Sequence, residues 1–302
     1  MSTNHLQSEI RNPKSEIGES AIRNPHSAIK ALVRQIVAVF LLSLRRLLRS
    51  KFLSAIITLG AIPVAIACLI ALSGRPMHQQ NVGRIQDVHA LLEGFLRFLY
   101  LHFIVFFGAN VLGFAVMRQE YDDQTLHYLF LQPVPRWMLV VGKAVAFVVL
   151  ASAVCVTSLW VTYLIMTLPR FGLAAVIADL FGKGRFVILA KESLVIALGL
   201  LAYGSIAMLM GSLFKSGFYA LILLAWESGL PYLPSTLKLW TVMHYLQSLL
   251  PERHTDLNRL FALLGEPASV WLSLAVIGGV SGVFIAACAF FYQFRECLYA
   301  EA

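Results

Sequence analysis

Apolar residues in this chain gather into long blocks that polar segments separate. Six such blocks occupy residues 52–72, 95–117, 138–167, 186–214, 218–232 and 268–292. A helix that crosses the hydrocarbon core of a bilayer needs about 20 predominantly apolar residues. The pattern therefore predicts an all-α, polytopic membrane protein with six transmembrane helices.

The polar segments between the blocks indicate different kinds of connection. Only Lys215, Ser216 and Gly217 separate the fourth block from the fifth, which predicts an antiparallel helical hairpin. We expect polar loops at residues 73–93 and 168–185. Residues 233–267 are moderately apolar but broken by prolines, so we expect short amphipathic or re-entrant helices there, outside the cytoplasm.

Two different segments precede the first block. Within residues 1–30 the sequence IRNPKSEI recurs as IRNPHSAI, and such a low-complexity repeat with Asn-Pro breakers predicts disorder. Residues 31–50 instead have apolar positions at helical spacing and arginines gathered towards one end. This pattern predicts an interfacial helix with its cations among the lipid headgroups. Residues 31–302 then form one transmembrane domain.

Composition and charge support a membrane protein and set its orientation. Hydrophobic residues make up 59% of the chain and charged residues only 13%, about half the charged fraction of a soluble domain. The net charge is +8, but the basic residues do not form a stripe interleaved with aromatic residues. We therefore expect no nucleic-acid partner. Basic residues instead cluster just before the first block, which predicts a cytoplasmic N-terminus. Six spans then place the C-terminus and residues 118–143 in the cytoplasm as well.

The sequence contains no recognisable motif of a catalytic site. Neither HExxH nor GxSxG occurs, and the four cysteines lack the spacing of metal ligands. Asp122 and Asp123 are adjacent, so on a helix they point about 100° apart. Gly142 and Lys143 resemble the end of a phosphate-binding loop, but Trp137 stands where that loop requires glycine. We expect a protein that is not an enzyme and that binds no cofactor or metal itself.

Polar residues inside the apolar blocks leave two interpretations open. His102 and Glu227 are candidates for the pathway of a carrier or channel driven by an ion gradient. In the alternative, His102 and Asn110 make interhelical contacts and Glu227 lies near the outer interface. Neither a carboxylate ladder nor an inverted repeat is visible in the sequence, which favours an energy source outside this chain.

Small residues four apart occur in two blocks. Gly278 and Gly282 lie in the last block, and Ala109 and Gly113 lie in the second. Such pairs let helix backbones approach closely. They indicate either packing within one subunit or a dimer seam.

The charged segment between the second and third blocks has a structure of its own. Residues 118–131 can form a short amphipathic helix, which Pro133 and Pro135 end because each removes an amide donor. Arg136 and Trp137 follow, where cationic and indole anchors are typical of a membrane interface. The pattern predicts a rigid polar element between two membrane helices.

This segment resembles the same region in the membrane subunits of ABC-2 type transporters, the permeases that work with a separate ATP-binding-cassette ATPase. The resemblance rests on an acidic residue, a Thr-Leu pair, a leucine-rich turn, Pro-Val-x-Arg and Gly-Lys; here these are Glu120, Thr125, Leu126, Leu129, Leu131, Pro133, Val134, Arg136, Gly142 and Lys143. Gln124 stands where the family usually has glycine. The basic lead-in helix and the six blocks extend the resemblance to about residues 32–292.

The resemblance implies that residues 118–131 are a coupling helix that docks on the ATPase. Docking would fall to five residues of this helix, Glu120, Asp122, Asp123, Thr125 and Tyr128. Pro133, Arg136 and Trp137 would anchor it. The implied partners are the ATPase with its ATP and Mg, the lipid bilayer, and a second copy of this chain or a related permease. The implied function is ATP-driven transport, usually export, in the plasma membrane, which is the inner membrane of a bacterium.

Overall fold

The computed structural model describes residues 25–49, 51–72, 85–122, 135–182, 184–214, 222–223, 227, 239–250 and 268–294. These residues are almost entirely helical, and none of them is in a strand. Five of the helical stretches are long and apolar enough to cross a membrane: Leu53–Leu72, Leu91–Gln119, Arg136–Pro169, Arg185–Leu213 and Val270–Gln293. They confirm an all-α, multi-pass membrane protein. The predicted fifth block, residues 218–232, lies almost wholly outside the described residues, so the count of six spans stays a prediction.

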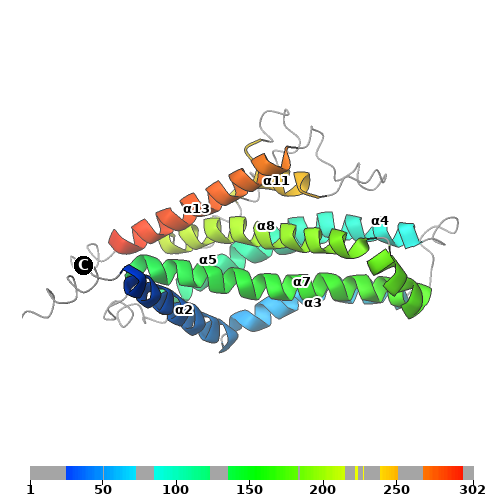
Figure 1. Cartoon of the computed structure of the whole chain (residues 1–302), viewed down its shortest axis with the longest axis horizontal. Helices are drawn as coiled ribbons and strands as arrows, with labels where there is room; N and C mark the ends of the chain where they lie inside the picture. Colours follow the sequence, from blue (N-terminus) through cyan, green and yellow to red (C-terminus); the bar gives the residue numbers. More distant parts are fainter. Residues whose placement is uncertain are drawn as a thin grey trace, which may run out of the picture.

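The helices form an elongated bundle (Figure 1). In chain order the elements are α2 (Pro25–Arg49), α3 (Lys51–Leu72), α4 (Ile85–Phe95), η1 (Leu96–Gly108), α5 (Ala109–Asp122), α7 (Arg136–Ile177), η2 (Ala178–Gly182), α8 (Arg185–Leu213), α11 (Val242–Ser248) and α13 (Val270–Phe294). Helix α2 and the C-terminal end of α13 lie at one end of the bundle, whereas α4 lies at the other. The bundle therefore has two distinct ends that can carry different functions.

Helix α2 begins at Pro25, six residues before the expected start of the interfacial helix. It has basic residues in its last turn, where the helix dipole favours cations. It packs along α7 and is followed almost directly by α3. Its position in a membrane interface stays a prediction.

The second membrane helix is longer than the sequence pattern predicts. Elements α4, η1 and α5 follow one another without a break, and η1 has the wider winding of a π-helix. The polar loop expected over residues 73–93 is therefore wrong from Ile85 onwards. Val88, Leu92 and Leu96 recur four residues apart and are buried, and this apolar stripe explains why a segment that looks polar is helical.

The predicted loop at residues 168–185 is also mostly wrong. Gly172 has φ 78° and ψ 165°, which breaks α7, and an apolar helical segment, Phe171–Gly182, follows. This segment folds back onto α7, as the hydrogen bond from the Tyr163 hydroxyl of α7 to Asp179 shows. Gly184, with φ 68°, then starts α8. Glycine suits both turns because it adopts positive φ without steric cost.

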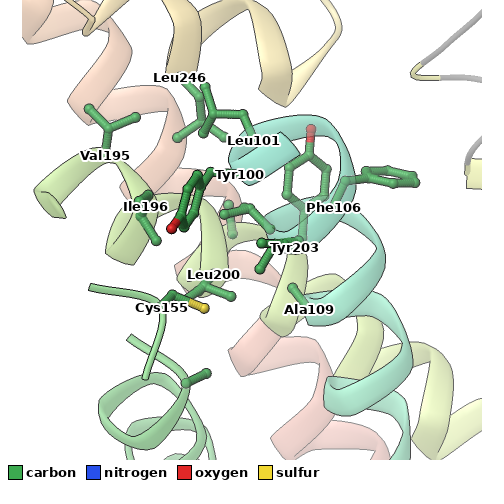
Figure 2. Packing of buried hydrophobic residues seen from close by; sticks show 14 of the residues in the cluster. Tyr100, Leu101, Phe106, Ala109, Cys155, Val195, Ile196, Leu200, Tyr203 and Leu246 are labelled. Atoms are coloured by element: carbon green, nitrogen blue, oxygen red, sulfur yellow. The ribbon is translucent and has the colours of Figure 1, made fainter. Parts of the chain in front are cut away.

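The core lies between α5 and α8. A Cβ added at Gly113 would lie 2.9 Å from the Cβ of Ala207 and 3.0 Å from the carbonyl oxygen of Gly204. The pair of small residues in the second block therefore serves packing within one subunit. Figure 2 shows the neighbouring apolar cluster, in which the rings of Phe106 and Tyr203 meet edge to face with centroids 5.1 Å apart.

Helix α13 is much less covered than the helices of the core. Only 17% of its apolar 18-residue stretch is buried, against 72% of the corresponding stretch in α8. Among the residues that the structure describes, a Cβ added at Gly278, Gly279 or Gly282 would meet nothing within 4 Å. No described residue therefore covers this glycine face.

Candidate functional site

The predicted docking element lies mostly outside the described residues. Glu120 and Asp122 belong to the last turn of α5, and nothing is described of their side chains. The other docking candidates, Asp123, Thr125 and Tyr128, and the anchor residue Pro133 fall outside the described residues. The structure does describe the two ends that hold this element, α5 before it and α7 after it.

Arg136, which the sequence predicts as an anchor, makes a specific contact at the start of α7. Pro135 has the extended backbone that precedes the helix. Arg136 Nη1 donates a hydrogen bond to the carbonyl oxygen of Gln293, 3.0 Å away, near the end of α13. The side chain of Trp137 is 45% exposed, as an indole at a membrane interface requires. The exit from the docking element is thus tied to α13.

Gly142 and Lys143 lie where three helices meet. A Cβ added at Gly142 would lie 2.6 Å from Cγ1 of Val39, so glycine here lets α2 pack closely on α7. Lys143 is buried, and its Nζ lies 5.6 Å from the ring centroid of Tyr292 in α13. A desolvated cation over an aromatic face is stabilised by the ring quadrupole. The Gly-Lys pair therefore joins α2, α7 and α13, which is a structural reason for the motif.

His102 and Asn110, the polar residues of the second block, lie several turns from either end of its helix. His102 follows the start at Ile85 by several turns, and it is half-buried. The start predicted at residue 95 would place His102 in the first turns of this helix, and the observed start at Ile85 corrects that position. Asn110 is buried, and its Nδ2 donates to the carbonyl oxygen of Phe106, 2.7 Å away and one turn earlier in the same stretch.

Glu227 supports α11. Its Oε1 accepts a hydrogen bond from the backbone N–H of Val242, the first residue of that helix, at 3.2 Å. Thr241 accepts from the N–H of His244 at 3.3 Å. The first amides of a helix have no partner within it, and a carboxylate is favourable beside them. Glu227 is buried, so this contact explains a carboxylate in an apolar stretch without assigning it to a transport pathway.

A buried polar cluster that sequence reasoning missed lies at the other end of the bundle. His89 Nε2 lies 2.9 Å from Asp179 Oδ2, and the Tyr163 hydroxyl donates to the same oxygen at 3.0 Å. The cluster joins α4, α7 and η2. Sequence reasoning assigned His89 and Asp179 to loops, and the only available signal was a single charged residue inside an apolar run, as in LAAVIADLF.

An ion pair inside α8 extends this cluster. Arg185 Nη2 lies 3.5 Å from Glu192 Oε1, and both side chains are only 1% exposed. The two residues are seven apart, so they occupy the same face of the helix. Glu192 lies near the start of the block predicted over residues 186–214, and its side chain is buried there. A buried charge is costly unless it is paired, so this end of the bundle holds charged groups that depend on one another.

A third polar contact lies between the two ends. The Tyr100 hydroxyl lies 3.0 Å from Ser158 Oγ and 3.1 Å from Thr162 Oγ1. Ser158 in turn donates to the carbonyl oxygen of Gly60 in α3. Hydrogen bonds of this kind hold membrane helices together, here α3, η1 and α7.

Metal chemistry has no visible basis in the part of the chain that the structure describes. There, no three His, Cys, Asp or Glu side chains come close enough to hold an ion. The described polar residues bridge helices or cap helix ends. These contacts can hold the helices of the bundle together.

The five membrane-length helices define the class as a multi-pass helical membrane protein. A family model described as ABC-2 family transporter protein matches residues 73–226, just over half of the chain. The chain belongs to this family, whose members are the membrane subunits of ABC transporters. No curated protein matches the chain. The matched region includes both helices that flank the docking element and the buried cluster at the other end.

Proposed function

We propose that this chain is the permease subunit of an ATP-driven exporter, in which a separate ATPase subunit hydrolyses ATP and drives substrate across the membrane. The observation that carries the proposal is the junction at the start of α7. There Arg136 bonds to the end of α13, Gly142 contacts α2, and Lys143 lies over Tyr292. A push on residues 123–134 would reach three helices through this junction.

The continuous helices would carry the movement across the membrane. The docking element begins in the last turn of α5, which continues η1 and α4 without a break, and it precedes α7. Both helices reach the opposite end of the bundle, where His89 of α4 contacts Asp179. In the proposed cycle, ATP-driven closure of the ATPases moves the docking elements and rearranges this far end.

The export path would lie between two permeases. A second copy of this chain, or a related permease, would supply the other half. The open glycine face of α13 supports this, since backbones can approach closely at Gly278 and Gly282. We place the complex in the inner membrane of a bacterium with both termini in the cytoplasm, because basic residues cluster before the first span.

Charge reversal in the docking element tests the proposal. The chain is co-expressed with a candidate ATPase subunit that carries a phosphate-binding loop, and the double variant Glu120→Lys/Asp123→Lys is compared with the wild type. We expect loss of ATPase co-purification, because the acidic docking face becomes basic. The matched control is the double variant Glu296→Lys/Glu301→Lys, which makes the same charge change near the C-terminus. Unchanged assembly and unchanged ATP-stimulated transport in the double variant would refute the docking assignment.

The gradient-driven alternative makes the opposite prediction. A carrier that uses His102 and Glu227 transports without nucleotide, and Glu227→Gln abolishes that transport. Under the proposal, Glu227→Gln keeps transport, since the amide oxygen still accepts from Val242. Reconstituted vesicles with an ion gradient and no ATP separate the two cases.

A further inference from the structure

A groove opens beside α2 at the end of the bundle that carries the α7 junction. It has a volume of about 810 Å³, and the described residues that line it are Ala38, Leu41, Leu42, Arg45, Arg46, Arg49 and Gln119. Six of these residues come from α2, and Gln119 comes from the end of α5. Neither the family match nor the proposed docking element accounts for this groove.

The basic side of the groove is concentrated in the last turn of α2. Arg45 and Arg49 are four residues apart and Arg46 and Arg49 three, so they are neighbours on the helix surface. Like charges at this spacing repel one another. Arg45 and Arg49 are exposed. The site therefore favours an anion that several guanidinium groups can bind together, as they do phosphate.

The apolar side of the groove begins one turn earlier on the same helix. Leu41 is 46% exposed and Leu42 is 57% exposed, so this part of the lining offers apolar surface to a hydrocarbon chain. A free phosphate ion makes no use of this surface. A molecule with a phosphate at one end and a hydrocarbon chain at the other matches both parts of the lining.

The groove lies at the level of a membrane surface. Arg49 precedes Leu53, the first residue of one candidate span, by four residues, and Gln119 is the last residue of another. Both span ends therefore mark the same face of the membrane. Phospholipid headgroups lie at this depth, and basic pockets beside membrane helices bind anionic headgroups.

We propose that this groove binds one anionic phospholipid, with its phosphate against Arg45 and Arg49 and an acyl chain along Leu41 and Leu42. The lipid would lie between α2 and the end of α5, directly before the docking element. It would thereby fix the distance between these helices, and an anionic bilayer would favour the assembled state. The proposal needs the membrane location and the groove, but not the ATPase.

Lipid binding to the purified full-length protein tests the proposal. The protein is delipidated in detergent, and phosphatidylglycerol or phosphatidylcholine is titrated while bound lipid is counted by native mass spectrometry. For the wild type we expect phosphatidylglycerol to bind at least tenfold more tightly than phosphatidylcholine. Arg45→Gln/Arg49→Gln should weaken phosphatidylglycerol binding by about 30-fold, at about fivefold for each arginine beside anionic lipid. Phosphatidylcholine binding should stay unchanged.

Arg34→Gln is the matched control, because Arg34 is an exposed arginine of the same helix outside the groove. It should retain the wild-type preference. Gln119→Glu is a second variant that leaves α2 intact and places a negative charge in the groove. It should also lower the preference for phosphatidylglycerol. Circular dichroism and gel filtration test whether each variant is folded. If Arg45→Gln/Arg49→Gln is not folded, the lipid preference of Gln119→Glu decides whether the groove binds the lipid.

Four results would overturn the proposal. Equal losses in Arg34→Gln and in the groove variants would indicate diffuse attraction to anionic lipid. Wild-type binding by the groove variants would exclude the groove. Displacement of phosphatidylglycerol by millimolar inorganic phosphate would indicate a free-phosphate site. Loss of ATPase co-purification with unchanged lipid binding would identify a protein interface. The ATPase measurement also separates failure of this proposal from failure of the proposed function.

Discussion

His89 and Asp179 are separated by 90 positions in sequence, yet His89 Nε2 lies 2.9 Å from Asp179 Oδ2. The contact joins the start of the second membrane helix to the segment that folds back after the third. Because Tyr163 donates to the same carboxylate oxygen, Asp179 connects three elements at one end of the bundle.

Replacing Asp179 should loosen this end. We expect Asp179→Ala to lower the free energy of unfolding by about 3 kcal/mol, because it leaves His89 and Tyr163 without this buried acceptor. Asp179→Asn keeps an acceptor oxygen and should cost less. Thermal unfolding in detergent measures both variants, and an unchanged midpoint for Asp179→Ala would contradict the role of this contact.

The ion pair in α8 should show strong coupling. Arg185→Met leaves Glu192 buried without its counter-ion and should cost roughly 3–5 kcal/mol. The double variant Arg185→Met/Glu192→Met removes both charges and should recover most of that loss. A double-mutant cycle on unfolding midpoints measures the coupling, and simple additivity of the two single changes would show that the pair does not interact.

Gly142 should tolerate no side chain while Val39 faces it. Gly142→Ala places a methyl group 2.6 Å from Cγ1 of Val39, and overpacking of this kind costs about 1–3 kcal/mol. Val39→Ala in the same protein should relieve the clash. Gly94→Ala is the control, since a Cβ there meets nothing within 4 Å. The unfolding midpoint reports all three, and a loss in Gly94→Ala as large as that in Gly142→Ala would argue against a specific contact.

The glycine face of α13 should control association rather than folding. Gly278→Leu/Gly282→Leu adds bulk at positions that no described part of the single chain contacts. We therefore expect little change in the unfolding midpoint of the monomer but a smaller dimer fraction. Chemical crosslinking in liposomes measures that fraction. Wild-type dimer levels would place the seam elsewhere.

The membrane helices could be predicted from sequence because their signal is local. Long apolar runs need no partner to be recognised, and four of the six blocks recur as spans within a few residues at most of the predicted bounds. The second block was recognised too, but its first turns carry His89 and Glu93 and so resembled a loop. Both side chains are buried, which tertiary contacts decide and local composition does not.

The candidate sites were predictable to different degrees. Arg136 was expected to act as an interfacial anchor from its place beside Trp137, but its partner, the carbonyl oxygen of Gln293, lies 157 positions away. The importance of Asp179 depends in the same way on a long-range neighbour, His89. The partner of Arg185, Glu192, is only seven positions away, but the burial of both side chains depends on tertiary packing. Local sequence shows which residues are polar, but it cannot show which of them the fold withdraws from water.

The length of α7 determines how deep in the bilayer the end of its span at Pro169 lies. The span Arg136–Pro169 has 34 residues, so it is about 51 Å long. The hydrocarbon core is about 30 Å thick, and even at a tilt of about 40° the helix covers roughly 39 Å along the membrane normal. With Trp137 at one edge of the hydrocarbon core, the excess of about 9 Å reaches the headgroup layer of the opposite leaflet. Asp179 bonds to Tyr163, six residues before Pro169. The buried cluster around Asp179 would then lie near the boundary between the lipid tails and the headgroups rather than in the middle of the bilayer.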